Sequence, residues 1–326
     1  MGATKQNGES VHALNLADGS LVWSTRISGA FGASSGNGPR GTPTIDGDRL
    51  YALGLAGDLA CLNVESGKVL WQKNVLKAFK ASRPGWSICE SVLIDGGKLI
   101  CTPGGSGATM VALDKLTGDE LWRSATPGNP RAGYASPIIA TVGGVKQYIN
   151  FTSRSVIGVR ASDGHFLWNN TDSANGTANC SSPLTYKNMV FSASGYGRGG
   201  AMLQLTSQGG LTSAKQVYHT RDMKNHHGGM LILDGFLYGY NDGGGLTCLE
   251  LKTGQVAWKN RSVGKGAVAY ADGHIYLRSE SGPVALVVAS PKSYVEQGRF
   301  KQPNRSGRRA WPHPVVADGR LFLRDQ

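Results

Sequence analysis

Short runs of apolar residues, separated by tight turns, make up most of the chain. In segments 43–51 and 92–100, two such runs flank an Asp-Gly turn. Asp-Gly between β-rich runs is a strong hairpin signal, because the turn requires positive φ angles. Similar turns occur at Gly143-Gly144, Lys187-Asn188, Asp234-Gly235, Asp272-Gly273 and Asp318-Gly319. The pattern predicts a succession of antiparallel hairpins.

A second hairpin recurs with a fixed interval between a glycine and a tryptophan. The tryptophan comes four residues after the glycine in five pairs: Gly19 and Trp23, Gly67 and Trp71, Gly118 and Trp122, Gly164 and Trp168, and Gly254 and Trp258. These tryptophans are 48, 51, 46 and 90 residues apart, the last interval being two units of about 45. Each repeat of about 45 residues therefore holds four strands, which is typical of a propeller blade.

The recurrence of this pair favours a structural role over substrate binding. A glycine at the start of the outer turn leaves the backbone free of a side chain. The tryptophan ring is expected to pack between neighbouring blades and to donate its N–H to a backbone carbonyl. Two blades, near 204–217 and 284–300, keep their hairpins but lack the pair, and we interpret them as degenerate.

We predict one all-β domain over residues 1–326, a β-propeller of four-stranded antiparallel blades with no helix longer than about two turns. The expected partial blades are 1–27 and 311–326, and the complete blades are about 41–74, 88–124, 134–170, 180–220, 228–261 and 265–300. The chain begins with an outer strand pair and ends with an inner one. It is therefore expected to be truncated at both ends, or to combine these pairs into one blade that closes a seven-bladed ring.

Composition and charge exclude several classes of protein. With 40% hydrophobic and 17% charged residues, and no long apolar run, the chain is neither disordered nor transmembrane. The net charge of +12 suits a polyanionic partner, but a concentrated basic stretch occurs only at Arg299, Lys301, Arg305, Arg308 and Arg309. Few aromatic residues interleave with it, so no nucleic acid is expected. The five scattered cysteines predict neither a disulfide framework nor a zinc site.

Candidate site residues precede or begin the innermost strand of each blade. In a propeller these strands line the central channel, so their polar and aromatic side chains are expected to converge at one funnel. The candidates are Arg40, Trp86, Glu90, Tyr134, Asn179, His226, His227, Lys265, Trp311 and His313. Such a set suits a small polar or anionic ligand, more so below pH ~6.5, where imidazoles become charged. The alternative is that these residues bind water and hold neighbouring blades together.

No catalytic residue and no metal site is predicted. Adjacent side chains of a strand point to opposite faces, so His226 and His227 are not expected to bind one metal ion. Glu90 has no partner carboxylate at a fixed spacing for glycosidase chemistry.

The segment 112–122 resembles the repeat of pyrroloquinoline quinone (PQQ) β-propellers. That group includes quinoprotein alcohol dehydrogenases and the outer-membrane assembly lipoprotein of the BamB type. The strings at 40–43, 101–105, 133–136 and 225–229 are similar to exported PQQ-like repeat proteins of planctomycete-type bacteria. The resemblance covers nearly the whole chain and implies an eight-bladed propeller of the periplasm or cell envelope. The residues near Met1 carry no secretory signal.

The resemblance leaves two functions open. Dehydrogenases of this fold use a disulfide of adjacent cysteines over PQQ, and calcium held by carboxylate and amide side chains. This sequence has no adjacent cysteines and no CxxCH haem motif. We therefore expect a non-catalytic binding or scaffold module without a cofactor, which meets protein partners through loops or blade edges. The alternative is a PQQ- and calcium-dependent quinoprotein dehydrogenase that oxidises alcohols or sugars.

Overall fold

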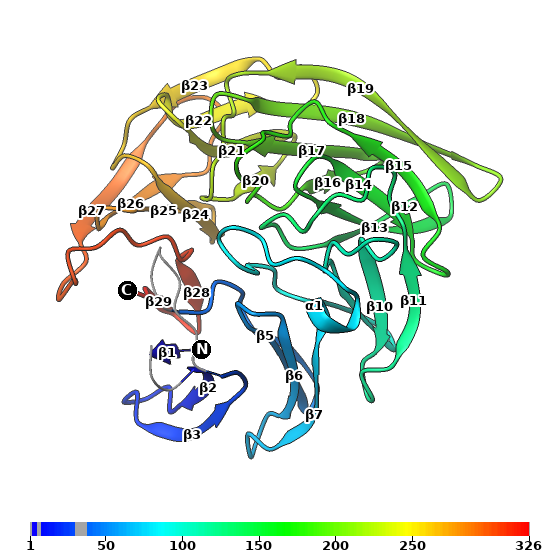
Figure 1. Ribbon diagram of the computed structural model, residues 1–326. Helices are drawn as coiled ribbons and strands as arrows, with labels where there is room; N and C mark the ends of the chain where they lie inside the picture. Colours follow the sequence, from blue (N-terminus) through cyan, green and yellow to red (C-terminus); the bar gives the residue numbers. More distant parts are fainter. Residues whose placement is uncertain (1, 5–7, 30–37, 326) are drawn as a thin grey trace. The chain divides into compact units, whose positions relative to one another are not determined.

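The computed structural model describes residues 2–4, 8–29 and 38–325, which form a β-propeller fold (Figure 1). These residues make six four-stranded sheets, one three-stranded sheet and one two-stranded sheet. In each sheet the strands follow one another in sequence order, and neighbouring strands are antiparallel. The predicted class, an all-β propeller of four-stranded blades, is confirmed. Among the described residues the one helix is α1 (Val75–Ala78), a single turn.

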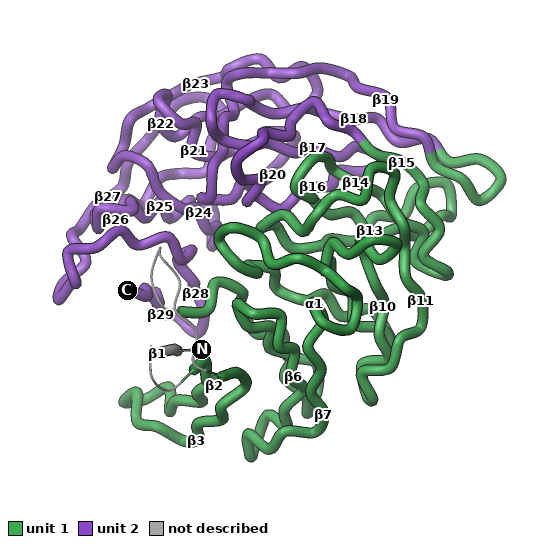
Figure 2. Tube along the Cα trace, in the orientation of Figure 1, with its two compact units in different colours: residues 1–169, 207–212 green, residues 170–206, 213–326 purple. Residues whose placement is uncertain are grey.

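The chain divides into two compact units, and each is described by itself (Figure 2). Unit 1 comprises residues 1–169 and 207–212, and unit 2 comprises residues 170–206 and 213–326.

Unit 1 contains the three-stranded sheet and three four-stranded sheets, the last of which ends one residue inside unit 2. Its strands are β1 (Gly2–Thr4), β2 (Gly8–Leu14) and β3 (Leu21–Arg26); β4 (Thr44–Asp46), β5 (Arg49–Leu53), β6 (Asp58–Asn63) and β7 (Val69–Asn74); β8 (Leu93–Asp95), β9 (Lys98–Cys101), β10 (Met110–Asp114) and β11 (Glu120–Ser124); and β12 (Ile138–Val142), β13 (Val145–Phe151), β14 (Val156–Arg160) and β15 (Phe166–Asn170).

Unit 2 contains the other three four-stranded sheets and the two-stranded sheet. Its strands are β16 (Leu184–Tyr186), β17 (Met189–Ser194), β18 (Gly199–Gln208) and β19 (Leu211–Thr220); β20 (Met230–Leu233), β21 (Phe236–Asn241), β22 (Gly245–Glu250) and β23 (Val256–Asn260); β24 (Gly266–Ala271), β25 (His274–Ser279), β26 (Pro283–Val288) and β27 (Glu296–Lys301); and β28 (Val315–Ala317) and β29 (Arg320–Phe322). The tip of the β18–β19 hairpin, 207–212, belongs to unit 1.

The hairpin turns have the backbone that their sequences predict. Asp234 and Gly235 both have positive φ, 48° and 80°, and so do Asp272 and Gly273, 48° and 74°. These angles match the right-handed twist of the flanking strands, so the register of each hairpin is set locally. In the hairpins β4–β5 and β8–β9 the second strand is almost wholly buried, because a neighbouring sheet covers each of its faces.

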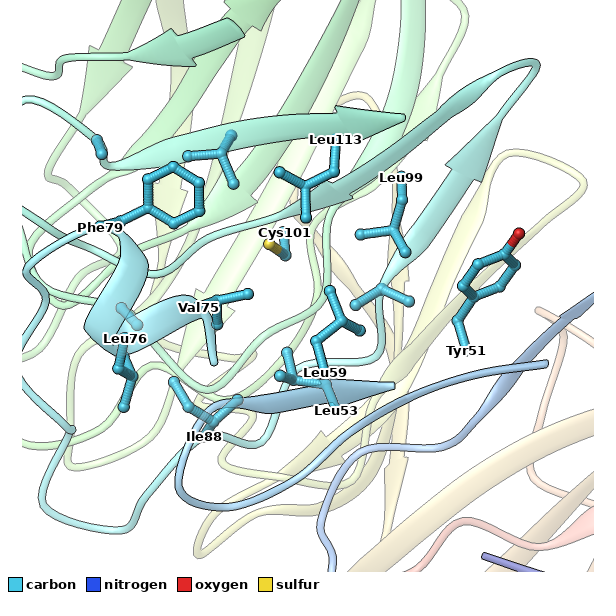
Figure 3. Close-up of a cluster of buried hydrophobic side chains, with 14 of the residues drawn as sticks. Tyr51, Leu53, Leu59, Val75, Leu76, Phe79, Ile88, Leu99, Cys101 and Leu113 are labelled. Carbon is cyan, nitrogen blue, oxygen red and sulfur yellow. The ribbon is translucent and has the colours of Figure 1, made fainter. Parts of the chain in front are cut away.

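A buried cluster between two sheets of unit 1 shows how neighbouring blades share a core (Figure 3). Leu59 of the β4–β7 sheet and Leu99 of the β8–β11 sheet are both fully buried in it. Val75 and Leu76 of α1 pack into the same cluster. Asn74 begins the helix by accepting a hydrogen bond from the Lys77 amide at 2.9 Å.

An aromatic ring of one sheet lies on a glycine of the next, which we call the aromatic–glycine contact. A Cβ atom on Gly67 would lie 2.6 Å from the Trp23 ring, and one on Gly118 would lie 2.8 Å from the Trp71 ring. Trp71 Nε1 donates to the carbonyl of Lys115 at 3.0 Å, three residues before that glycine. Glycine is therefore required for two reasons. The ring occupies the place of a side chain, and the backbone has a positive φ.

One of the two degenerate blades supplies a tyrosine for this contact. The ring of Tyr218 on β19 lies on Gly254, where a Cβ atom would be 2.5 Å away. Its hydroxyl donates to the carbonyl of Leu251, again three residues before the glycine, at 2.8 Å. The loss of the Gly/Trp pair from this blade therefore leaves its contact with the next blade intact.

Trp168 departs from the expected arrangement. Its ring folds over Gly158 of its own sheet, and Nε1 donates to Gln147 Oε1 at 2.7 Å. Gln147 Nε2 donates in turn to Thr212 Oγ1 at 3.4 Å, at the tip of the β18–β19 hairpin. Arg160 Nη1 binds the carbonyl of Gly210 in the same tip at 3.0 Å. Polar side chains thus hold this tip where the other blades use a ring.

We predict that Trp122→Ala lowers the free energy of unfolding by about 3–5 kcal/mol, as measured by urea denaturation. The side chain is 9% exposed, stacks on Tyr148 and lies on Gly164. Trp86→Ala is the matched control, because Trp86 is 39% exposed, and it should cost less than about 1 kcal/mol. Equal losses in the two variants would contradict a role for this contact.

Candidate functional site

The ten candidate residues fall in both units. Arg40, Trp86, Glu90 and Tyr134 lie in unit 1, and Asn179, His226, His227, Lys265, Trp311 and His313 lie in unit 2. Their convergence on one funnel stays a prediction. Within each unit, however, several of them contact one another.

Three candidates of unit 1 hold three loops together. Arg40 Nη1 donates to the carbonyl of Trp86 at 2.8 Å. The Trp86 and Tyr134 rings meet edge to face, with centroids 5.7 Å apart, and the Trp86 amide donates to the Tyr134 hydroxyl at 3.4 Å. The Arg40 guanidinium therefore has a protein partner already.

Glu90 is a buried carboxyl that connects two sheets. Its Oε1 accepts a hydrogen bond from the Thr102 amide at 2.9 Å, and its Oε2 accepts one from Asn150 Nδ2 of β13 at 3.1 Å. Burial raises the pKa of Glu90 from 4.5 to about 8, and these hydrogen bonds lower it only in part. At neutral pH the side chain is therefore a neutral acid.

A second buried carboxyl, Glu9 of β2, was not predicted. Its Oε2 accepts from the Leu55 amide at 2.8 Å and from Ser28 Oγ at 3.2 Å. Burial raises its pKa. Like Glu90, it connects one sheet to the loop of the next, and no sequence motif distinguishes it from a surface glutamate.

In unit 2, four aromatic rings form a row. Tyr196 meets His226 with centroids 4.8 Å apart, His226 meets His227 at 4.9 Å, and His227 meets Trp311 at 5.7 Å. The expectation that His226 and His227 point to opposite faces is wrong, because they precede β20 in a loop and strand alternation does not apply. Within the described residues, no three His, Cys, Asp or Glu side chains are grouped to hold a metal ion.

Lys265 contacts the row of rings at His226. Its Nζ donates to Asp242 Oδ2 at 2.8 Å and lies 2.9 Å from His226 Nδ1. Burial, and then the charge of Lys265, lower the pKa of His226 to about 4. Burial also lowers the pKa of His313, whose Nε2 is 3.2 Å from the carbonyl of His227. The expected gain of positive charge just below pH ~6.5 therefore does not apply to these two imidazoles.

Glu280 joins the row of rings to the C-terminal segment. Trp311 Nε1 donates to its Oε2 at 3.1 Å, and His227 Nε2 lies 3.3 Å from the same atom. The His227 contact is the main cause that lowers the pKa of Glu280 to about 2. Sequence reasoning missed Glu280 and Asp242, since neither precedes an inner strand.

Asn179 is buried and has a local role. Its Oδ1 accepts from the Asn175 amide at 3.0 Å, and its Nδ2 donates to the Asn175 carbonyl at 3.3 Å. These bonds close a short loop before β16. None of the five cysteines forms a disulfide, and three of them, Cys61, Cys101 and Cys248, are buried in strands.

Comparison with known proteins relates the chain to one family. Residues 7–260 match the family described as outer membrane protein assembly factor BamB. A Burkholderia pseudomallei protein of that name is 28% identical over 152 residues, which cover 45% of this chain and 36% of that protein. The protein of that name from Salmonella typhimurium is 23% identical over 347 residues, which cover 93% of this chain and 85% of that protein. The chain therefore spans about a third of the first relative and most of the second.

Solved structures support the fold. BamB from Moraxella catarrhalis superposes with a TM-score of 0.69 at 16% identity, covering 100% of this chain and 90% of that one. Quinohemoprotein alcohol dehydrogenase from Comamonas testosteroni gives 0.62 at 13% identity, covering 96% and 67%. In the described part of the chain, no helix has the length and apolar character needed to cross a membrane.

We predict that Glu90→Gln changes the pH dependence of stability. The folded protein retains a proton on Glu90 that the unfolded chain releases above pH 4.5, so this group lowers stability as pH rises from about 5 to about 8. The unfolding free energy of the variant minus that of the wild type should therefore be about 2–4 kcal/mol larger at pH 9 than at pH 5. A change in stability that the amide causes equally at all pH values cancels in this comparison. Parallel pH profiles in urea denaturation would contradict the prediction.

Proposed function

The chain belongs to the family of the outer membrane protein assembly factor BamB, and from this we propose that it is a non-catalytic binding module of the bacterial cell envelope. Its role would be to hold protein partners during outer membrane protein assembly. The observation that carries the proposal is the family match over residues 7–260, which takes in the strands from β2 to β23.

The use of the candidate polar groups supports a module without catalysis. Arg40 binds a backbone carbonyl, Lys265 pairs with Asp242, and Glu280 accepts from Trp311. A catalytic acid or base must reach a substrate proton with a suitable pKa. In both units these groups instead hold loops and sheets together, so we propose that they stabilise the scaffold and do not form a ligand site.

The residues present do not fit PQQ and calcium. The sequence has no adjacent cysteines to form the disulfide over the quinone, and none of its five cysteines forms a disulfide. Within the described ranges, no three carboxylate, histidine or cysteine side chains are grouped around a point that an ion would occupy. The similarity to quinohemoprotein dehydrogenases lies at 13% identity and concerns the fold.

We predict that the purified protein does not bind PQQ tightly. Titration with PQQ and calcium, followed by absorbance and by thermal shift, should give no saturable change at micromolar quinone, because the expected ligands are missing. Submicromolar binding together with dye-linked alcohol oxidation would overturn the proposal in favour of a quinoprotein dehydrogenase.

The proposed role in the envelope is tested by gene deletion in the bacterium that encodes the chain. Quantitative proteomics of the outer membrane should show lower amounts of integral outer membrane proteins, with recovery when the gene is restored. A deletion strain with an unchanged outer membrane proteome would contradict the role in assembly.

A further inference from the structure

The outermost strand of one blade of unit 2 is unusually long. β19 has ten residues, whereas the outer strands β3, β7, β11, β15, β23 and β27 have five or six. It is the last strand of the β16–β19 sheet, so its outer edge has no strand partner among the described residues. Figure 1 shows β19 at the end of this sheet. Such an edge presents free backbone N–H and C=O groups.

One face of β19 is exposed along its whole length. The alternating residues Leu211, Ser213, Lys215, Val217 and His219 are all exposed. Leu211 is 54% and Val217 is 49% exposed, so apolar area lies on both sides of the Lys215 cation. The other face contacts neighbouring blades: Thr212 Oγ1 accepts a hydrogen bond from Gln147 Nε2, and the Tyr218 ring lies on Gly254. β19 therefore uses one face for contacts with neighbouring blades and leaves the other face exposed.

Other outer strands are protected in ways that natural sheet edges commonly use. β11 carries the ion pair between Glu120 and Arg123, and β27 carries the one between Glu296 and Arg299. The pairing of β3, β7, β11, β23 and β27 also has an irregular register next to the outer turn. Ion pairs and bulges of this kind discourage the addition of another strand. β19 has no proline, and no carboxylate of the described chain pairs with Lys215.

The charged residues of the β16–β19 sheet itself have one sign. Residues 173–221 contain no aspartate or glutamate, and they include Lys187, Arg198, Lys215 and Arg221. This stretch covers the whole β16–β19 sheet. Lys215 on β19 and Arg221 directly after it therefore attract an acidic partner and repel a basic one.

We propose that the outer edge of β19 is a docking site for an extended acidic segment of a partner protein, which adds to the sheet as a fifth strand. This inference rests on the proposed function as a binding module and identifies its surface. Backbone hydrogen bonds along the edge would supply affinity, as in other cases of strand addition. Lys215 and His219 would select acidic side chains, and Leu211 and Val217 would cover apolar side chains between them.

The test uses a fluorescent peptide of about nine residues, with glutamate at alternate positions and valine or threonine between them. It should bind the purified full chain with a micromolar Kd that weakens with salt. Hydrogen exchange should show protection on binding in residues 211–220. Lys215→Glu should weaken binding at least about tenfold, since it places a carboxylate opposite the glutamates. The matched control is Lys292→Glu, an exposed lysine of the β26–β27 turn, which should bind like the wild type.

A second peptide separates strand addition from simple charge attraction. Methylation of alternate backbone nitrogens preserves its charge but removes the N–H donors along one edge, and binding should be lost when that edge faces β19. The proposal is overturned if both methylated forms bind equally well, if Lys215→Glu has no effect, or if the protected segment lies elsewhere. The proposal is also overturned if the wild type binds no peptide and Lys215→Glu aggregates. Lys215 would then only prevent the edge from pairing with other copies of the chain. Such a failure leaves the outer membrane proteome test of the function untouched.

Discussion

The aromatic–glycine contact is the interaction on which the order of successive blades depends. Four outer strands, β3, β7, β11 and β19, each place one ring on a glycine of the next sheet, in the room that a Cβ atom would fill. The polar atoms of Trp23, Trp71 and Tyr218 also donate to a carbonyl three residues before that glycine. A short four-stranded sheet buries little surface alone, so its stability depends on the adjacent sheet. The contact therefore sets both the position and the stability of neighbouring blades.

The need to join neighbouring blades also explains the partners of the polar candidate residues. Glu90 connects the β8–β11 sheet to Asn150, and Glu280 connects β25 and β26 to the segment at Trp311. A buried carboxyl or histidine is costly unless it is hydrogen-bonded, and here the partners are protein groups. A chain whose polar groups are occupied in this way has its edges and loops left for recognition. This distribution favours a binding module.

Much of the fold was predictable because its signals are local. The Asp-Gly turns and the Gly-to-Trp interval each lie within a few residues, and the hairpins follow from them. The polar relay of Trp168 and the replacement by Tyr218 were not predictable, because they depend on segments more than 30 residues apart. For the candidate site, position before the inner strands predicted residues of which several contact one another within each unit. It could not indicate their partners Asp242 and Glu280, which become neighbours only through the fold.

A double-mutant cycle between Trp71 and Gly118 measures the central contact directly. Gly118→Ala should be strongly destabilising in the wild type, because its Cβ atom would lie 2.8 Å from the ring at a positive φ. In the Trp71→Ala background only the backbone strain remains, so the two changes should be coupled by more than about 0.5 kcal/mol. Gly128→Ala, whose Cβ atom would meet nothing within 4 Å, should be additive with Trp71→Ala. Additivity of Gly118→Ala with Trp71→Ala would contradict the account.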